Sequence, residues 1–156
     1  MTQFADRPNT IPWPPILFIG AIIMANLLSW LAPLALPISG ALVQGGGVGL
    51  VTGGFVLMGW SFLTFRRART TILPHQRSDA LITTGPFTWS RNPIYLSEVL
   101  ILSGLGLMNG WLWYLLLTPV FALAVTRLAI VREEAHMLAR FGAEWEAYSA
   151  TVRRWL

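Results

Sequence analysis

The stretch from Leu81 to Glu98, LITTGPFTWSRNPIYLSE, leads into a long apolar run. It places one charged group, Arg91, directly at the start of that run, between Pro86 and Pro93. A charged side chain beside a hydrocarbon-length segment is costly unless an anionic group meets it. Arg91 therefore predicts a partner, which is a carboxylate elsewhere in the chain or a ligand.

The composition around this stretch is typical of a membrane protein. Of the 156 residues, 54% are hydrophobic and 12% are charged, which is about half the charged share of a soluble domain. No charged residue lies between Arg7 and Arg66 or between Glu98 and Arg127. Each gap exceeds the roughly 20 residues that a helix needs to cross a bilayer. We expect a single all-α integral membrane domain over residues 1–156, with two spans in each gap.

The apolar runs predict four transmembrane helices, over about residues 14–32, 48–65, 93–107 and 111–130. The glycines at 45–47 and the run 108–110 predict turns. In the second helix, three small residues predict a smooth face for another helix: Gly49, Gly53 and Gly54. Pro93 suits a first helical turn, and Pro119 predicts a kink in the fourth helix.

The arginines predict the orientation of the chain in the membrane. Arg66, Arg67 and Arg69 follow the second predicted span, and positive charge beside a span stays in the cytoplasm. The loop 66–92 and both termini are therefore predicted to be cytoplasmic. We expect the part of this loop from Arg69 to Pro86 to fold over the site and to become ordered when ligand binds. Residues 1–12 lack a basic segment and a cleavage site, so the first span is predicted to stay uncleaved.

The C-terminal segment predicts an amphipathic helix over residues 131–152. One stripe recurs at steps of four and three: Glu134, Leu138, Phe141, Trp145, Tyr148 and Val152. The predicted hairpin of the third and fourth helices brings Arg91 and the pair Glu133–Glu134 to the same end of the bundle. Two interpretations remain open, a structural ion pair that anchors the C-terminal helix and a functional site.

Metal and thiol chemistry are not expected. The chain has no cysteine and two histidines, which excludes disulfides, thiolate metal sites and a cysteine nucleophile. Two histidines are too few for a histidine-based metal site, so we expect no metal-binding residues.

Four segments follow one another in a recognisable order: Gly85-Pro86-Phe87, Arg91-Asn92-Pro93-Ile94-Tyr95, Arg132-Glu133-Glu134, and Phe141-Gly142-Ala143-Glu144-Trp145-Glu146-Ala147-Tyr148. This pattern resembles the superfamily of isoprenylcysteine carboxyl methyltransferases and phospholipid methyltransferases. The resemblance covers about residues 66–156, and the first two spans match only in being apolar.

The resemblance implies an integral membrane enzyme that uses S-adenosyl-L-methionine, held by the last helical hairpin and the C-terminal segment. It implies three catalytic residues: Arg91, Glu133 and Glu134. It also implies a set of cofactor-binding residues: Gly85, Pro86, Phe87, Arg91, Asn92, Pro93, Tyr95, Glu133, Glu134 and Tyr148. Several aromatic faces are available to attract the positive sulfonium: Phe87, Trp89, Tyr95, Trp145 and Tyr148.

Three positions depart from the family pattern. Asn92 stands where many members have His, a replacement that bacterial-type members share, and Ser97 stands where Gly is usual. Asp79 lies where the carboxyl-methylating branch has a His. These departures bear on the methyl acceptor more than on the cofactor, and the bacterial style implies a bacterial inner membrane.

The acceptor is left open by the sequence. A lipophilic small molecule or lipid is expected as the substrate and the bilayer as the surroundings, with no nucleic acid, and the sequence does not indicate an oligomeric state. The acceptor is a lipid-linked carboxylate that Arg91 holds, a phospholipid amine that needs a base such as Glu133 or Glu134, or another lipophilic group such as a thiol or quinol. The alternative is a non-catalytic membrane assembly or accessory protein that retains the fold.

Overall fold

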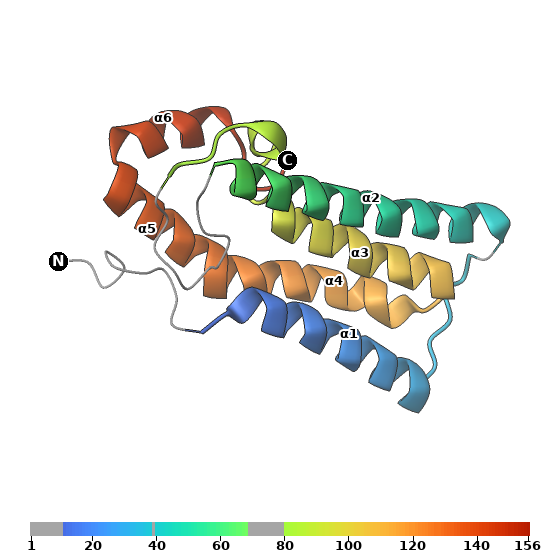
Figure 1. Cartoon of the computed structure of the whole chain (residues 1–156). Coiled ribbons are helices and arrows are strands. Elements are labelled where there is room, and N and C mark those ends of the chain that lie inside the picture. Colours follow the sequence, from blue (N-terminus) through green and yellow to red (C-terminus); the bar gives the residue numbers. More distant parts are fainter. Residues whose placement is uncertain (1–10, 39, 69–79) are drawn as a thin grey trace.

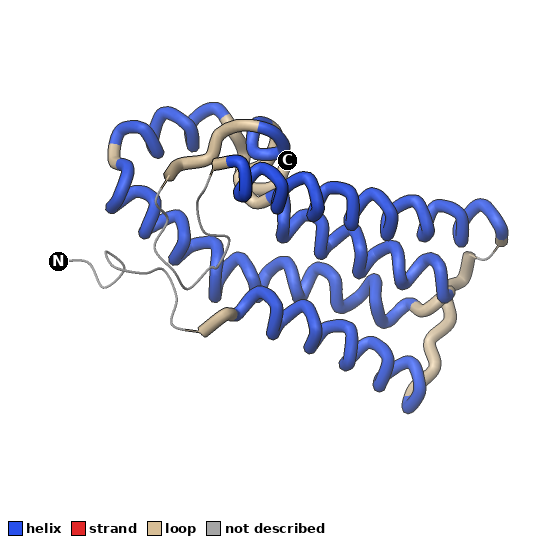
Figure 2. Tube along the Cα trace, in the orientation of Figure 1, coloured by secondary structure: helices blue, strands red, loops and turns tan. Residues whose placement is uncertain are grey.

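The computed structural model describes residues 11–38, 40–68 and 80–156, and these residues fold into helices without a β-strand. The order of elements is α1 (Trp13–Leu31), α2 (Ala41–Arg67), η1 (Gly85–Thr88), α3 (Pro93–Asn109), α4 (Leu112–Val125), η2 (Thr126–Ile130), α5 (Val131–Phe141) and α6 (Ala143–Thr151). Figures 1 and 2 show the long helices side by side. The predicted all-α class is confirmed.

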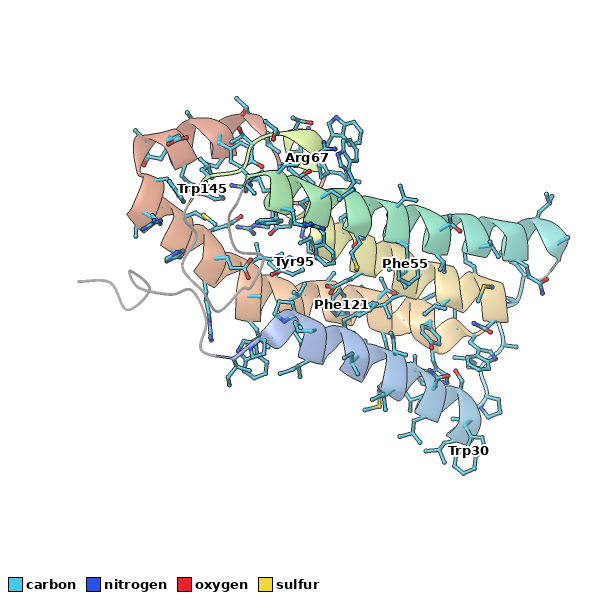
Figure 3. All side chains as sticks on the ribbon, in the orientation of Figure 1. Trp30, Phe55, Arg67, Tyr95, Phe121 and Trp145 are labelled. Atoms are coloured by element: carbon cyan, nitrogen blue, oxygen red, sulfur yellow. The ribbon has the colours of Figure 1, made fainter. Side chains whose placement is uncertain are left out.

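The long helices pack in the order α2, α3, α4, α1 (Figure 1). Within the described residues, three helical stretches are long and apolar enough to cross a membrane: Trp13–Leu31, Ala41–Arg67 and Leu112–Phe141. The apolar helix α3 has 17 residues, a length of about 26 Å at 1.5 Å per residue. The large side chains on the outer faces are apolar, as Trp30 and Phe55 illustrate in Figure 3, with exposed fractions of 78% and 60%.

The predicted turn at the glycines 45–47 is wrong. Helix α2 begins at Ala41, so these glycines lie inside it, and the helix is longer than the predicted span 48–65. The chain instead turns before α2 at Gly40, whose φ of 133° is easily reached only without a side chain. A run of glycines is therefore compatible with a membrane helix when another helix packs closely against it.

That close packing lies between α2 and α3. A Cβ added at Gly47 would lie 2.5 Å from the backbone N of Met108, and one at Gly104 would lie 2.7 Å from the carbonyl O of Gly47. Of the predicted small-residue face, only Gly54 makes such a contact, because Gly49 and Gly53 have nothing within 4 Å of an added Cβ. Helix α2 does present a small-residue face to α3, but Gly47 and Gly54 form it, without Gly49 and Gly53.

Helices α3 and α4 form an antiparallel hairpin, as predicted. The predicted turn covered residues 108–110, but α3 continues to Asn109. Of these residues only Gly110, with φ 68°, lies outside the helix. The fourth helix extends past residue 130 without a break, as a continuous stretch from Leu112 to Phe141. The irregular part of this stretch is the π-helical turn η2, which lies beyond Pro119.

The predicted amphipathic helix 131–152 is interrupted. Gly142 adopts φ 50° and separates α5 from α6, a conformation that glycine reaches at little cost. Helix α6 then folds back over the end of the bundle that carries η1 (Figure 1). The predicted stripe is consequently divided, since Leu138 is 45% exposed whereas Trp145 and Tyr148 on α6 are buried.

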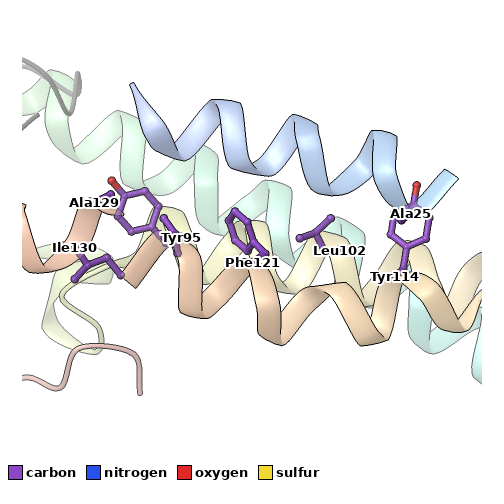
Figure 4. Packing of buried hydrophobic residues seen from close by; sticks show 8 residues of the cluster. Ala25, Tyr95, Leu102, Tyr114, Phe121, Ala129 and Ile130 are labelled. Atoms are coloured by element: carbon purple, nitrogen blue, oxygen red, sulfur yellow. The ribbon is translucent and has the colours of Figure 1, made fainter. Parts of the chain in front are cut away.

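The core lies between α1, α3 and α4. Its buried residues are Ala25, Tyr95, Leu102, Tyr114, Phe121, Val125, Ala129 and Ile130, and Figure 4 shows them along the bundle. Most of these side chains are apolar, but Tyr95 carries a hydroxyl to the end of the cluster near η2 (Figure 4). The first part of the predicted lid, residues 69–79, and the departure at Asp79 lie outside the described residues, so the lid stays a prediction.

Candidate active site

The C-terminal tail is held against the segment that precedes α3 by hydrogen bonds to the backbone carbonyl groups of the tail. The N–H of Arg91 donates to the carbonyl O of Arg153 at 2.9 Å. The side-chain amide of Asn92 donates to the carbonyl O of Arg154 at 2.9 Å, and the hydroxyl of Ser90 donates to the same oxygen at 3.3 Å. Pro93 then occupies the first turn of α3, as predicted. These bonds fix where the Arg91 side chain leaves the backbone.

Arg91 meets the acidic pair through Glu134, so the predicted approach is confirmed. Its Nη2 lies 3.3 Å from Oε1 of Glu134. A second guanidinium, from Arg154 in the tail, donates through Nε to Oε1 at 3.0 Å and through Nη2 to Oε2 at 2.6 Å. Hydrogen bonding to Glu134 raises the pKa of Arg154. Glu134 is therefore a carboxylate held between two cations.

Glu133 has a different environment from its neighbour. The hydroxyl of Tyr95, which is 8% exposed, donates to Oε1 of Glu133 at 2.7 Å. The π-helical turn η2 directly precedes α5 and so sets the register of the acidic pair; such turns are frequent at functional sites. One carboxylate of the pair thus faces arginines, and the other faces the end of the core.

Aromatic rings form one wall of the site. The hydroxyl of Tyr148 donates to the carbonyl O of Phe87 at 2.7 Å, and the ring of Trp145 lies 5.7 Å from that of Tyr148. The guanidinium of Arg91 sits over the Trp145 ring at 5.6 Å. Burial raises the pKa of Tyr148 to about 12, although the charge of Arg91 acts in the opposite direction. The Tyr148 hydroxyl therefore keeps its proton and its bond to η1 at neutral pH.

These side chains line a cleft of about 500 Å³, a volume that includes its opening to solvent. The enclosed part of the cleft is much smaller, about 70 Å³. The lining residues are Phe65, Ala80, Leu81, Ile82, Phe87, Arg91, Asn92, Glu133, Glu134, Met137, Trp145 and Tyr148. Figure 3 shows Trp145 at this end of the bundle, with Tyr95 further towards the core.

The cleft contains six of the ten predicted site residues: Phe87, Arg91, Asn92, Glu133, Glu134 and Tyr148. The other four lie around it. Pro86 and Pro93 are buried supports, Tyr95 contacts Glu133, and Gly85 borders a second hollow next to Thr64. Trp89 does not line the cleft, because it is 63% exposed and packs against Trp60.

Several residues of the site were not predicted. Leu81, Ile82 and Met137 supply apolar lining, and an isolated apolar residue gives no signal in a sequence that is mostly apolar. Arg154 was missed because its partner, Glu134, is 20 residues away along the chain. Its position in a short basic tail after a predicted amphipathic helix was the available signal.

Comparison with known proteins identifies the class to which this fold and site belong. The sequence model described as phospholipid methyltransferase matches residues 43–144, more than half of the chain. The chain belongs to the phospholipid methyltransferase family, and so to the membrane methyltransferases.

Two curated proteins are similar over part of the chain. The nickel-cobalt-cadmium resistance protein NccN of Alcaligenes xylosoxydans xylosoxydans is 33% identical over 76 residues, which are 47% of this chain and 34% of that protein. An uncharacterized protein of Haemophilus influenzae is 40% identical over 65 residues, which are 40% of this chain and all of that protein. The chain therefore spans about a third of NccN. No solved structure matches.

Proposed function

We propose that this protein is an S-adenosyl-L-methionine-dependent methyltransferase of the membrane that methylates a lipophilic or lipid-linked acceptor. The observation that carries this proposal is the cleft, in which side chains from α2, η1, the segment before α3, α5 and α6 converge. They include one guanidinium, two carboxylates and an edge-on pair of aromatic rings, Trp145 and Tyr148. Those residues come from the same motifs that resemble the family, and the family match supports the same reaction class.

The residues of the cleft fit this cofactor chemically. The Nε of Arg91 is buried and has no hydrogen-bond partner among the described residues, so it is suited to the carboxylate of an amino-acid group. Carboxylate oxygens at Glu133 and Glu134 are suited to an ammonium or a ribose hydroxyl. The face of Trp145 is suited to a sulfonium or a flat base, because aromatic faces attract cations and stack.

The protein itself does not need to form a covalent bond in this reaction. The cofactor, when bound, supplies an electrophilic methyl group on a sulfonium. Arg91 and Glu134 fix the orientation of bound groups, because each is itself held by other residues. Leu81, Ile82 and Met137 give the cleft an apolar lining, which disfavours water beside the reacting groups. Orientation and exclusion of water account for much of the rate in transfers of this kind.

The proposal includes a topology. We infer that α3 crosses the membrane together with the three longer helices, which gives four spans. The arginines that end α2 at Arg66 and Arg67 favour a cytoplasmic position for the site. The acceptor then approaches from the bilayer, and the isoprenylcysteine-type carboxylate and the phospholipid amine both remain in the proposal.

Calorimetric titration tests the function directly. S-adenosylhomocysteine titrated into the purified protein in detergent should bind at one site, and a labelled methyl group should appear in membrane lipids. Arg153→Gln is a matched control for Arg154→Gln, because the Arg153 side chain is exposed whereas Arg154 grips Glu134. Only Arg154→Gln should weaken binding. Absence of binding in the wild-type protein would favour a non-catalytic accessory protein instead.

A further inference from the structure

Glu98 is a buried carboxylate that the proposed site has not yet used. It lies five residues after Pro93 on α3, about 7 Å along the helix from its start. Its side chain belongs to a residue that is 6% exposed, and its Oε2 has no hydrogen-bond partner among the described residues. A buried carboxylate without a partner is costly. Ionisable groups retained in apolar helices are functional candidates for this reason.

Glu98 belongs to the surroundings of Glu133. Tyr95 precedes it by three residues and so occupies the same face of α3. The Tyr95 hydroxyl bonds to Glu133 at 2.7 Å, and Glu98 is close enough to interact electrostatically with both Glu133 and Tyr95. Figure 4 shows Tyr95 at the end of the core, beside Ala129. Tyr95 and Glu133 are hydrogen-bonded and Glu98 lies near both, so polar groups extend from the cleft into the apolar bundle.

The charges around Glu133 and Glu98 differ from those around Glu134. Two guanidinium groups neutralise Glu134, whereas the contact described for Glu133 is an uncharged hydroxyl. A carboxylate acceptor that entered beside Glu98 and Glu133 would meet two carboxyl groups instead of a guanidinium. An amine, hydroxyl or thiol would instead offer them a proton, and bonding to a carboxylate favours such a group.

We propose that Glu98 is a proton-accepting residue of this site, acting with Glu133 across Tyr95, and that it selects an acceptor whose nucleophilic atom carries a proton. The inference rests on the proposed methyl transfer. As the acceptor atom forms its bond to the methyl carbon, the carbon–sulfur bond breaks and its electron pair stays on sulfur. The proton of the acceptor atom passes to the Glu98 carboxylate, and Glu133 connects this carboxylate to the cleft.

The first test compares acceptors that differ only in their head group. Hexadecylamine, hexadecanethiol and hexadecanoate are offered to the wild-type protein in detergent with a labelled methyl donor. The protic amine or thiol should be methylated at least about tenfold faster than hexadecanoate. Hexadecanoate as the best acceptor, or failure of both protic probes in a protein that binds S-adenosylhomocysteine, would overturn the inference. A wild-type protein that neither binds S-adenosylhomocysteine nor transfers a methyl group would instead refute the proposed function.

The second test uses variants of Glu98. Glu98→Gln keeps the shape but cannot accept the proton, so transfer to the protic probe should fall by about 100-fold, the lower range for general base catalysis. The affinity for S-adenosylhomocysteine should stay within about twofold, and Glu98→Asp should recover part of the rate. Glu146→Gln, on the exposed side of α6, is the matched control and should behave as the wild type.

Two results of the variant test would contradict the role of Glu98. One is an unchanged transfer rate in Glu98→Gln. The other is a loss of rate matched by an equal loss of S-adenosylhomocysteine affinity, which would indicate a purely structural role. If Glu98→Gln does not fold, Glu98→Asp is measured alone, and a rate equal to that of the wild type would refute the inference, because a shorter carboxylate moves the accepting oxygens.

Discussion

Two buried tyrosines offer a matched test of the charge on Glu133. Tyr95 and Tyr148 are both 8% exposed, and each hydroxyl donates one hydrogen bond of 2.7 Å. The acceptor is a carboxylate oxygen of Glu133 in the first case and the backbone carbonyl of Phe87 in the second. Replacement of each tyrosine by phenylalanine removes the same atom from a side chain with the same exposed fraction. Any difference in effect therefore reports the nature of the acceptor.

The expected free energies follow from the two acceptors. A hydrogen bond to a charged group contributes about 1.5–3 kcal/mol, and one between neutral groups about 0.5–1.5 kcal/mol. At about 2–4 °C for each kcal/mol in a chain of this size, Tyr148→Phe should lower the melting temperature by about 1–6 °C. Tyr95→Phe should lower it by about 3–12 °C if Glu133 is ionised.

Differential scanning calorimetry of both variants in one detergent measures these shifts, and methyl transfer to hexadecylamine is measured on the same samples. We expect Tyr95→Phe to melt earlier and also to lose transfer activity, since it breaks the connection between Glu98 and Glu133. Equal melting temperatures in the two variants would refute a charged Glu133. Full activity in Tyr95→Phe would refute the connection through Tyr95.

Three further predictions concern the acidic pair, the helix packing and the topology. Arg91→Lys keeps the charge but loses the planar fork, so most methyl transfer should disappear from a folded protein. Glu134→Gln should weaken S-adenosylhomocysteine binding by about tenfold, or 1.4 kcal/mol; an early-melting protein with normal affinity in calorimetry would end this assignment. Gly104→Ala should cost about 1–3 kcal/mol in chemical unfolding, because its Cβ would lie 2.7 Å from backbone. Gly59→Ala, with open space around it, should cost nothing, and an equal loss in both would contradict the packing. A cysteine at Ile38, in a chain that has none, should react with an impermeant reagent only from outside the cell; labelling from the cytoplasmic side alone would reject four spans.

The sequence was sufficient for the parts of the fold that hydrophobicity and charge determine. The α3–α4 hairpin was predicted because Pro93 and Gly110 bound an apolar run with no charge after Glu98. The beginning of α2 was not, because a glycine run has the same appearance in a turn and in a tightly packed membrane helix. The contacts of Gly47 that distinguish the two come from α3, which is distant in the sequence.

The candidate site was predictable where a motif carried it. Arg91 and the acidic pair were expected to meet, since the hairpin returns the chain to its starting end, and Arg91 lies 3.3 Å from Glu134. The contact of Arg154 was not predictable, because it requires the break at Gly142 that returns the tail to the cleft. The predicted amphipathic helix continued through Gly142, so it placed the C-terminal tail away from the cleft.

The acidic pair now divides into two roles. Successive residues on an α-helix point about 100° apart, so neighbouring carboxylates cannot face the same wall of the cleft. Glu134 is directed towards Arg91 and Arg154, and Glu133 is directed towards Tyr95. Glu134 therefore holds the tail and Arg91 in place, and under the proposed mechanism Glu133 links Glu98 to the cleft. Because each has its own partners, neither glutamate can replace the other when it is changed.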